Sequence, residues 1–415
     1  MLRHLWRYLN RASGGTTTGD GNLFKFVIYC VRISIIPITY LLWLFEPFIK
    51  IRIHRGQISR IGHLSHYFEV LVRTKEVDLL NKNTLDIFIV TKNPANKTLY
   101  NMWKKHLLFI ESNKLDFIYH LCSPLLINRR HFGPKNVQHG GLLYTKPTLS
   151  FSKDQNIKGD KLAKEFGIEE NDWFVCLHNR SSIYLKNLMN KKNFSHHDLR
   201  DSSFEMLYES AKLINSKGGK CLRMSSGDND QLSTNAKEYI TDYASNWHTD
   251  FMDIYLSQKC KFFLGGPSGL ISVPQIFNIP VGCTNVFPVN ITSTSKNCLF
   301  IPKLMWKIEE KRFLSYKEII DGNLNKFLLA AQYLTHGIEV IENDSDDIRL
   351  LTEDMFDLVN NKQLSTKDEN KRNDFMNKYF IVNKFTNKYH NYDGLKFSGK
   401  ISWRFLNKHS YLMND

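Results

Sequence analysis

The sequence lacks the cysteine patterns that build disulfide frameworks and zinc sites. Its seven cysteines are an odd number, they lie far apart, and no two have the C-x-x-C spacing. Cys176 and Cys221 lie inside apolar runs, where a cysteine usually behaves as a small buried hydrophobic residue. We therefore expect free thiols in a reducing compartment and no cysteine-based metal site.

Long low-complexity tracts, internal repeats of solenoid length and recognised nucleic-acid-binding motifs are also absent from the sequence. Their absence argues against a disordered chain, a solenoid and a dedicated nucleic-acid-binding protein. Hydrophobic residues make up 42% of the 415 positions, which is enough for packed cores. A chain of this length favours two or three structural units.

Acidic residues are the scarcer of the two charged classes. The chain has 41 Asp and Glu residues against 56 Lys and Arg residues, which gives a formal net charge of +15. Such an excess suits an anionic partner, which can be a nucleic acid, a phosphorylated small molecule or an acidic membrane. The charge alone does not choose among these partners.

One apolar run near the start of the chain raises the question of a membrane. Phe26–Phe45 is apolar for about twenty residues and is interrupted by Arg32 and Pro37. Basic residues flank the run on both sides, which suits a re-entrant or interfacial segment on anionic lipid better than one simple crossing. We expect a flexible lead-in at 1–22 and a membrane-associated helical segment at 23–48, with a core helix as the alternative.

Short apolar strands alternate with helical segments in the rest of the chain, first over 49–165 and again over 166–340. This alternation predicts an α/β protein with two Rossmann-like lobes that face each other across a cleft. A helical segment at 341–415 is expected to pack back on the lobes. The expected strands are Ile49–Ile53, Leu85–Thr91, Leu107–Ile110, Trp173–His178, Lys220–Met224, Lys261–Leu264 and Val281–Val286.

One of these strands ends in glycines and leads into an expected helix. Gly265 and Gly266 interrupt the apolar run, and Pro267 suits the first turn of a helix. Backbone N–H groups left free at such a turn, together with the helix dipole, bind anions such as a diphosphate. The turn is neither a G-x-G-x-x-G motif nor a P-loop, so a tight turn without a ligand is the alternative interpretation.

Two arginines lie at the ends of successive strands of the second lobe. His178-Asn-Arg180 comes directly after one strand, and Arg223 ends the next. Open α/β sheets bind ligands at the carboxyl ends of their strands, and a guanidinium group suits phosphate. We expect the two arginines, Ser268 and the glycine turn to form one metal-free diphosphate site, although each arginine alone is more often a surface group.

A series of motifs covers most of the chain. The stretches are Ser59–Leu64, Val175–Arg180, His197–Asp201, Gly218–Met224, Asp253–Gly265, Ser268–Gly269, Glu342–Ile348, Glu353–Met355 and Trp403–His409. In this order they resemble a family of bacterial surface-polysaccharide glycosyltransferases. His178-x-Arg180 is also similar to a strand end of GDP-fucose-dependent transferases, although the acidic residue that follows it there is missing here. The resemblance implies a GT-B arrangement with the donor diphosphate in the second lobe.

The resemblance also implies a reaction. A sugar would pass from a nucleoside-diphosphate sugar to a polysaccharide or lipid-linked acceptor, in the synthesis of surface glycans such as lipopolysaccharide. Cationic groups and N–H donors would stabilise the charge on the departing diphosphate, so no metal or other cofactor is expected. The residues assigned to the donor diphosphate are His178, Arg180, Arg223, Ser268 and the backbone amides of Gly266 and Gly269.

Other residues receive supporting or catalytic roles. Arg200 is expected to order the loop between the arginines, and Asp253 to support the site or meet the ribose, with a plain helix-face carboxylate as the alternative. A general base must deprotonate the acceptor hydroxyl, and the candidates are His63, whose pKa range suits the task, and Glu69. His63 could instead pack against the first helix, and His139 is a further candidate.

Two other interpretations remain open at this point. Asp228-Asn-Asp230 could hold a divalent cation on a diphosphate, as in a metal-dependent GT-A enzyme. A non-catalytic protein that binds a nucleotide or a glycan could also use the same fold. The expected location is the cytoplasmic face of the inner membrane. The expected partners are a nucleotide sugar, a glycan or lipid-linked acceptor and the membrane surface, and no nucleic acid.

Overall fold

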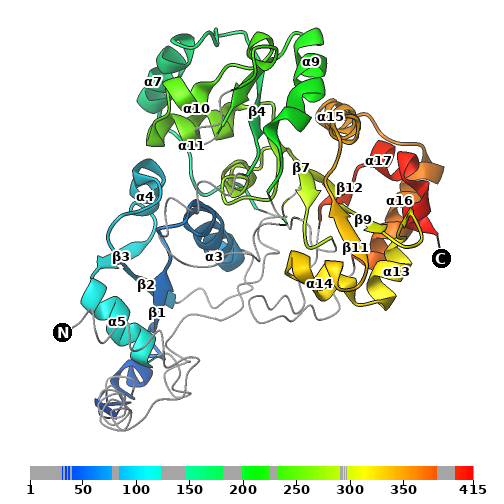
Figure 1. Ribbon diagram of the computed structural model, residues 1–415. Helices are drawn as coiled ribbons and strands as arrows, with labels where there is room; N and C mark the ends of the chain where they lie inside the picture. Colours follow the sequence, from blue (N-terminus) through cyan, green and yellow to red (C-terminus); the bar gives the residue numbers. More distant parts are fainter. Residues whose placement is uncertain are drawn as a thin grey trace. The chain divides into compact units, whose positions relative to one another are not determined.

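The computed structural model describes residues 30, 33–34, 36–37, 40–76, 84–122, 145–180, 199, 201–224, 232–289, 293, 295, 297–380 and 398–414. The chain divides into two compact units (Figure 1). Unit 1 comprises 1–57, 81–93 and 106–135, and unit 2 comprises 58–80, 94–105 and 136–415. The expected lead-in at 1–22 lies outside the described residues.

Unit 1 is built on a parallel three-stranded sheet. Its strands are β1 (Lys50–Gly56), β2 (Thr84–Val90) and β3 (Leu108–Glu111), which pair in the order β1-β2-β3, and the helix α5 (Asn113–Cys122) follows. All three strands were expected from the sequence. The apolar end of β2 is buried, as suits a strand in the middle of a parallel sheet.

A buried charged cluster joins β1 to β2. Arg52 lies opposite Asp86 in the register and donates to both carboxylate oxygens, at 2.8 and 3.0 Å. His54 Nε2 lies 2.5 Å from Asp86 Oδ1, and its ring stacks on Phe88. These contacts compensate for the loss of hydration that buried charges suffer, and they hold the two strands in register.

Unit 2 is organised around a parallel six-stranded sheet of order β12-β8-β7-β6-β4-β5. Its strands are β4 (Phe174–His178), β5 (Lys220–Arg223), β6 (Phe262–Gly265), β7 (Val281–Val286), β8 (Cys298–Pro302) and β12 (Lys400–Ile401). The central strands are short apolar runs without an exposed face, which is the pattern of a parallel sheet covered on both sides. The expected α/β class is therefore confirmed.

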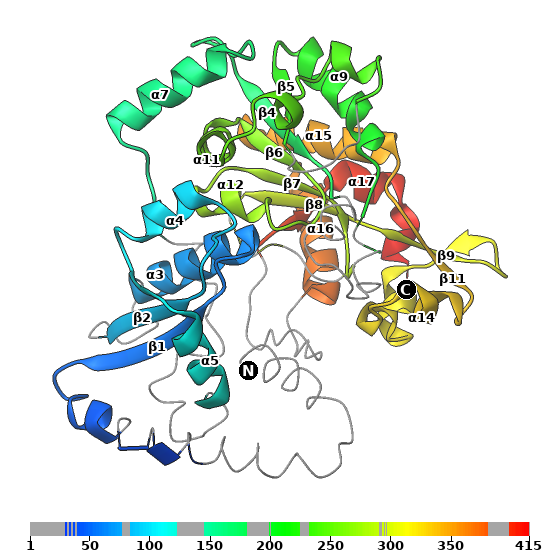
Figure 2. The ribbon, with the colours of Figure 1, turned by 60° about the vertical axis from the view of Figure 1, so that its left-hand side comes forward.

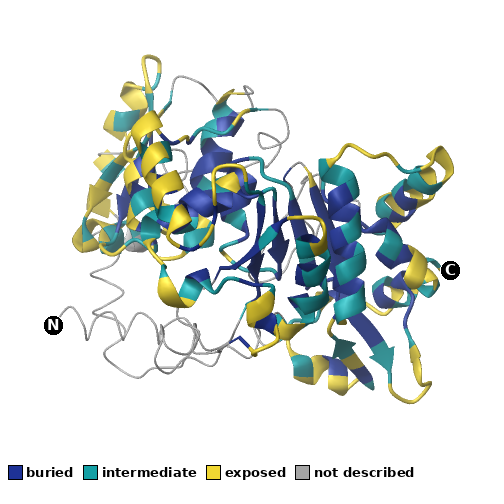
Figure 3. Cartoon of the chain, turned by 90° about the horizontal axis from the view of Figure 1, so that it is seen from above, coloured by how far each residue is buried: buried dark blue, intermediate teal, exposed yellow. Residues whose placement is uncertain are grey.

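Helices cover both faces of this sheet. The helix α15 (Ser345–Val359) contacts β6, β7, β8 and α9 (Tyr208–Ser216). The helices α11 (Asp250–Lys259) and α12 (Ser272–Ile276) pack together on the other face (Figure 2). Buried residues concentrate in the sheet and on the helix sides that face it (Figure 3). The helices of unit 2 are η1 (His63–Tyr67), α3 (Phe68–Glu76), α4 (Lys97–Trp103), α7 (Lys153–Lys164), η4 (Phe204–Leu207), α9 (Tyr208–Ser216), η5 (Ala236–Glu238), α10 (Tyr243–Asn246), α11 (Asp250–Lys259), α12 (Ser272–Ile276), α13 (Tyr316–Asp321), η6 (Leu324–Lys326), α14 (Ala330–Leu334), α15 (Ser345–Val359), α16 (Thr366–Tyr379), α17 (Trp403–Lys408) and η7 (Ser410–Met413).

A small antiparallel sheet extends unit 2. Its strands are β9 (Leu304–Lys307), β10 (Arg312–Phe313) and β11 (Ile338–Ile341), in the order β10-β9-β11. The strand β9 starts two residues after β8 ends, so the chain passes directly from the large sheet into the small one. The segment 341–415 was expected to contribute helices alone. It also contributes β12, which forms an edge strand of the large sheet.

The structure gives the expected membrane segment at 23–48 no support. Among the described residues, no helix is both long and apolar enough to cross a membrane. Most of 23–39 lies outside those residues, and helical turns are present at 40–44. Several large apolar side chains there are exposed, namely Tyr40, Leu41, Trp43, Leu44, Phe45 and Phe48.

Candidate functional site

Three strands that were expected to bear ligand-binding residues end at one edge of the large sheet. The strands β6, β4 and β5 are neighbours, Leu177 pairs with Arg223, and His178 pairs with Gly265. Because all three strands are parallel, their carboxyl ends lie together. The structure therefore brings together the strand ends that the sequence singled out.

His178 closes β4 and anchors this edge. The residue is buried, and its Nδ1 lies 2.6 Å from the carbonyl oxygen of Met224. Since a carbonyl oxygen only accepts hydrogen bonds, Nδ1 carries the hydrogen. This bond orients the ring and ties the end of β4 to the residue that follows β5.

Arg180 lies two residues beyond β4 and is mostly covered. Its Nε pairs with Asp201 Oδ1 at 3.3 Å, and its carbonyl oxygen accepts a hydrogen bond from the N–H of Ser202. The guanidinium is thus held by a neighbouring segment instead of extending freely into solvent. A held arginine loses less conformational freedom when it binds an anion.

Arg223 reaches the same edge, but its side chain is directed at other groups of the protein. It is 3% exposed, its Nη1 donates to Asp242 at 3.2 Å, and its guanidinium lies over the ring of Phe204. A buried guanidinium that already faces a carboxylate is poorly placed to bind a diphosphate directly. These contacts indicate that Arg223 stabilises the end of β5.

The first two glycines of the turn, Gly265 and Gly266, contact the backbone of β4 and are not directed at a ligand. A Cβ atom on Gly265 would lie 1.9 Å from the carbonyl oxygen of His178, so only glycine fits there. The N–H of Gly266 donates to that same oxygen at 3.1 Å. The amide of Gly266 was expected to face an anion, and this hydrogen bond contradicts that expectation.

The helix after the turn is shorter and later than expected. The helix α12 covers only Ser272–Ile276, so Pro267 lies in the turn before it. A five-residue helix has little dipole to offer, which removes much of the physical basis for an anion site at its N-terminus. Ser268 remains a candidate, because its Oγ is shielded from solvent and has no hydrogen-bond partner among the described residues.

Gly269 makes a backbone contact that sequence reasoning did not foresee. A Cβ atom on Gly62 would lie 2.9 Å from Gly269 Cα, and one on Gly269 would lie 3.0 Å from Gly62 N. The turn after β6 therefore packs directly on the start of η1. His63, the next residue after Gly62, is exposed and lies beside the turn that carries Ser268.

Glu69, the other candidate base, is part of a buried clamp. It is fully buried, its Oε1 pairs with Arg73 Nε at 2.5 Å, and it accepts a hydrogen bond from the N–H of Thr148. Arg73 also donates to Asn278 Oδ1 at 2.8 Å and to the carbonyl oxygen of Ile276. Burial raises the pKa of Glu69, and the Arg73 guanidinium opposes that rise. Such a carboxylate cannot reach an acceptor, so the structure contradicts a role as general base.

Asp253 also belongs to a structural cluster. Its carboxylate accepts a hydrogen bond from the hydroxyl of Tyr243 at 3.0 Å and pairs with His248 Nε2 at 2.9 Å. The hydrogen bond to Asp253 raises the pKa of His248. These contacts favour the alternative of a helix carboxylate that stabilises its surroundings.

Sequence reasoning missed a polar group that closes the edge of the sheet. Lys303 follows β8 and is buried, and its Nζ donates to the carbonyl oxygen of Asp201 at 3.0 Å. Its Nζ also lies 3.5 Å from Glu342 Oε1. The position of a cation directly after a buried strand, which drew attention to Arg180, was visible for Lys303 as well.

Several expected residues cannot be placed. Arg200, His139, Asp228 and Asp230 lie outside the described residues. Within the part of the chain that the structure describes, no group of three or more His, Cys, Asp or Glu side chains could hold a metal ion.

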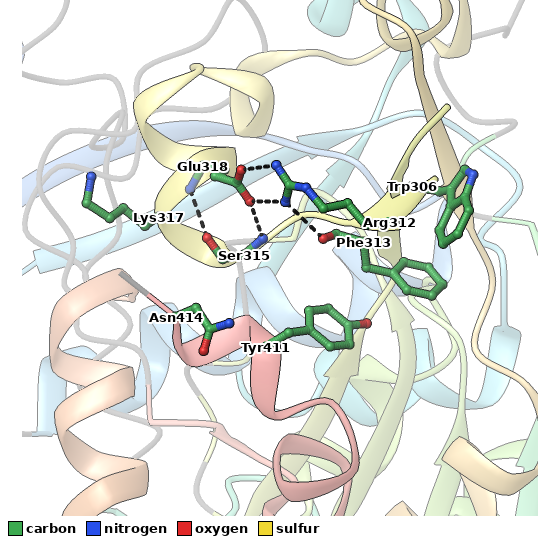
Figure 4. Close-up of a pocket in the computed structure, with 8 residues that line it drawn as sticks. All are labelled: Trp306, Arg312, Phe313, Ser315, Lys317, Glu318, Tyr411 and Asn414. Atoms are coloured by element: carbon green, nitrogen blue, oxygen red, sulfur yellow. Dashed lines mark hydrogen bonds and ion pairs between the residues drawn. The ribbon is translucent and has the colours of Figure 1, made fainter. Parts of the chain in front are cut away.

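A recess of about 570 Å³ lies on the antiparallel sheet (Figure 4). Its aromatic wall is formed by Trp306, Phe313 and Tyr411, and the last two rings stack with centroids 5.5 Å apart. Arg312 pairs with Glu318 at 2.6 Å and lowers the pKa of Glu318 to about 2. None of the residues expected at the site lines this recess.

No protein-family model matches the chain, and no curated protein matches it. Among solved structures, a family 9 glycosyltransferase from Veillonella parvula is similar at 10% identity, with 74% of this chain and 97% of that chain covered and a TM-score of 0.43. The ADP-heptose lipopolysaccharide heptosyltransferase II of E. coli is 12% identical, with 61% and 91% covered and a TM-score of 0.39. The E. coli heptosyltransferase WaaC with ADP is 11% identical over the same shares, with a TM-score of 0.34. Likenesses this distant do not assign an activity to the chain.

Proposed function

We propose that the chain is a glycosyltransferase of GT-B architecture. It transfers a sugar from a nucleoside-diphosphate sugar to a glycan or lipid-linked acceptor. The observations that support this proposal are that β4 and β6 end beside each other and that Gly62 contacts Gly269. Arg180 follows β4, Ser268 follows β6, and the contact of Gly62 with Gly269 brings His63 to the same turn. A cation, a hydroxyl and an imidazole are the groups that this reaction requires.

Arg180 and Ser268 bind the donor in this proposal. The bond between the sugar carbon and the diphosphate oxygen breaks, and the diphosphate takes the electron pair. Arg180 stabilises the added negative charge, and the Ser268 hydroxyl donates a hydrogen bond to a phosphate oxygen. His178 and Arg223 keep the ends of β4 and β5 in place, and Arg200 keeps the supporting role expected of it.

His63 acts on the acceptor. Its neutral imidazole takes the proton of the acceptor hydroxyl as the oxygen bonds to the sugar carbon, and the products are the glycosylated acceptor and a nucleoside diphosphate. The exposure of His63 suits a base that must meet a large acceptor. No metal or other cofactor takes part in the proposed reaction.

The test is a binding screen followed by turnover. UDP, GDP, CMP and ADP are compared by thermal shift, and sugar derivatives of the best nucleotide are then assayed with lipid-linked and polysaccharide acceptors. Arg180→Ala should lower kcat by roughly 10²–10³, as expected for one charge-stabilising donor. Arg349→Ala is the control, because Arg349 pairs with Asp346 on the surface of α15. Equal turnover in both variants would refute the role of Arg180.

The two alternatives give different results in the same assays. A non-catalytic binding protein would show a nucleotide-induced rise in Tm but no product from any nucleotide sugar. A metal-dependent enzyme that uses Asp228 and Asp230 would lose turnover in EDTA and regain it with a divalent cation. Our proposal requires turnover that EDTA leaves unchanged.

We also propose that the exposed apolar side chains of unit 1 contact the cytoplasmic face of the inner membrane. Leu44 and Phe48 are 66% and 81% exposed, and aromatic residues such as Trp43 are common at membrane interfaces. The full chain should float with vesicles that contain anionic phosphatidylglycerol, and Leu44→Asp with Phe48→Asp should reduce that binding. Flotation that these substitutions leave unchanged would place the contact elsewhere.

A further inference from the structure

Lys303 is a buried cation at the point where the large sheet passes into the small one. It lies between the end of β8 and the start of β9 and is 4% exposed. Burial lowers the pKa of its ammonium group, while Glu342 opposes that shift. Removing an ammonium group from water costs free energy unless other polar groups replace its hydration. The groups that contact Lys303 therefore indicate its structural role.

Glu342 lies beside Lys303 because of the pairing of the small sheet. The strands β9 and β11 lie side by side (Figure 2) and are antiparallel. In their register Ile341 pairs with Leu304. The residues next to this pair, Glu342 and Lys303, therefore meet at the base of the two strands. Lys303 and Glu342, which are far apart in the sequence, thus meet where the large sheet passes into the small one.

Lys303 and Glu342 hold the same short segment, 201–203. Lys303 Nζ donates to the carbonyl oxygen of Asp201 at 3.0 Å, and the N–H of Ser203 donates to Glu342 Oε2 at 3.4 Å. Lys303 therefore binds the first residue of the segment, and Glu342 binds the last. Backbone groups of a loop are thereby satisfied by charged side chains.

The segment 201–203 in turn holds the end of β4. Asp201 Oδ1 pairs with Arg180 Nε at 3.3 Å, and the N–H of Ser202 donates to the carbonyl oxygen of Arg180 at 3.3 Å. The side-chain amide of Asn179 donates to the carbonyl oxygen of Ser203 at 2.5 Å. Arg180 is therefore connected to Lys303 through one intervening segment.

We propose that Lys303 and Glu342 are positioning residues, which press the segment 201–203 against the end of β4 and so fix the guanidinium of Arg180. This inference rests on the proposed function for its catalytic consequence, since Arg180 is the group that meets the diphosphate. Neither Lys303 nor Glu342 touches the substrate. The charged groups around Lys303 Nζ are Glu342 and Asp201, and Asp201 faces Arg180 on its other side.

The first measurement is hydrogen exchange of the full chain without ligand. Lys303→Met keeps the length of the side chain and removes its charge, and it should speed exchange at the amides of 202–203 by roughly tenfold or more, as expected when local opening costs less. Amides of the β4 and β6 interiors should exchange as in the wild type. Lys303→Arg should restore part of the protection, and Lys307→Met, at the half-buried end of β9, should change nothing in this segment.

Glu342→Gln keeps the test valid if Lys303→Met does not fold. Glu342 is 42% exposed, so its substitution leaves no enclosed cavity, and it should speed the same amides. Unchanged exchange at 202–203 in both variants would overturn the proposal. Faster exchange spread evenly through the large sheet would overturn it too, because it would show a general loss of stability.

The second measurement separates this proposal from the proposed function. With an active wild type, Lys303→Met and Glu342→Gln should lower kcat/KM for the nucleotide sugar by roughly tenfold or more, as expected for a misplaced charge-stabilising group. In the Arg180→Ala background the same substitutions should have little further effect. If the wild type shows no turnover but the exchange result holds, the proposed function fails and the positioning of Arg180 stands. Full and independent losses in the Arg180→Ala background would overturn the proposal.

Discussion

Gly62 and Gly269 lie so close that a Cβ atom at either position would press on the backbone of the other. A Cβ atom on Gly62 would lie 2.9 Å from Gly269 Cα. The φ of Gly62 is −63°, which any residue can adopt, so the requirement for glycine is steric. This contact joins the turn after β6 to η1, the element in which the proposed base His63 is the first residue.

Gly62→Ala should test this contact. The added methyl group meets backbone instead of a flexible side chain, so the backbone must move, at a cost of about 1–3 kcal/mol in the free energy of unfolding. The kcat of Gly62→Ala should fall by more than the loss of folded protein explains, because the shift of the backbone also moves His63. Gly266→Ala is the matched control, since the nearest atoms to its Cβ are 3.5 Å away. Urea denaturation compares the two, and equal stability would show that the contact yields easily.

Ser268→Ala should separate ligand binding from folding. The Ser268 Oγ has no hydrogen-bond partner among the described residues, so its loss should leave the Tm of the free protein unchanged or slightly higher. Nucleotide affinity should fall roughly tenfold to a hundredfold, as expected for one hydrogen bond to a charged group. Isothermal titration measures this. Ser216→Ala on the exposed side of α9 is the control, and equal affinities in both variants would remove Ser268 from the site.

Arg73→Met should be among the most destabilising single substitutions. It leaves the Glu69 carboxylate buried without its guanidinium, which costs about 3–5 kcal/mol in the free energy of unfolding. Because burial raises the pKa of Glu69, the carboxyl can take up a proton, and the cost should shrink as the pH falls.

Adding Glu69→Gln to Arg73→Met removes the buried charge and should restore part of the lost stability. Arg349→Met is the control, since its surface pairs are worth about 1 kcal/mol or less. A double variant less stable than Arg73→Met would contradict the account of this clamp.

The His248–Asp253 pair should make stability depend on pH. The hydrogen bond to Asp253 raises the folded-state pKa of His248 above its ordinary value near 6.5. The pair therefore contributes its full stability below the unfolded-state pKa and loses it as the pH rises through the folded-state pKa. The Tm of the wild type should exceed that of His248→Gln at about pH 5.5, and the difference should shrink toward about pH 9.

The sheet edge could be predicted because its signals are local. The apolar runs of β4, β5 and β6 and the polar residues that follow them are adjacent in the sequence, and parallel strands end together. The sequence did not reveal that the amide of Gly266 is used by His178, since that bond crosses from one strand to its neighbour. The start of the helix after the turn was also predicted wrongly. The helix α12 has only five residues, and Asn278, with a positive φ, turns the chain soon after it ends.

Contacts between distant residues account for the other errors. Glu69 and Arg73 are four residues apart on one helix, so their pairing is visible in the sequence, but the partners that bury them are not. Asn278 lies about two hundred positions further on. Lys303 comes directly after β8, as Arg180 comes two residues after β4, and a search for cations just beyond buried strands would have found it.

The contacts of Arg73 attach the helix that follows the proposed base to other residues of unit 2. Through Ile276 and Asn278, Arg73 fastens α3, and with it η1, to the end of α12 and the residues that follow. The two glycines fasten the start of η1 to the turn after β6. His63 thus lies in the same compact unit as the sheet whose strand ends precede Arg180 and Ser268. In the proposed reaction the acceptor therefore has to be delivered to a base and donor groups that one unit already holds.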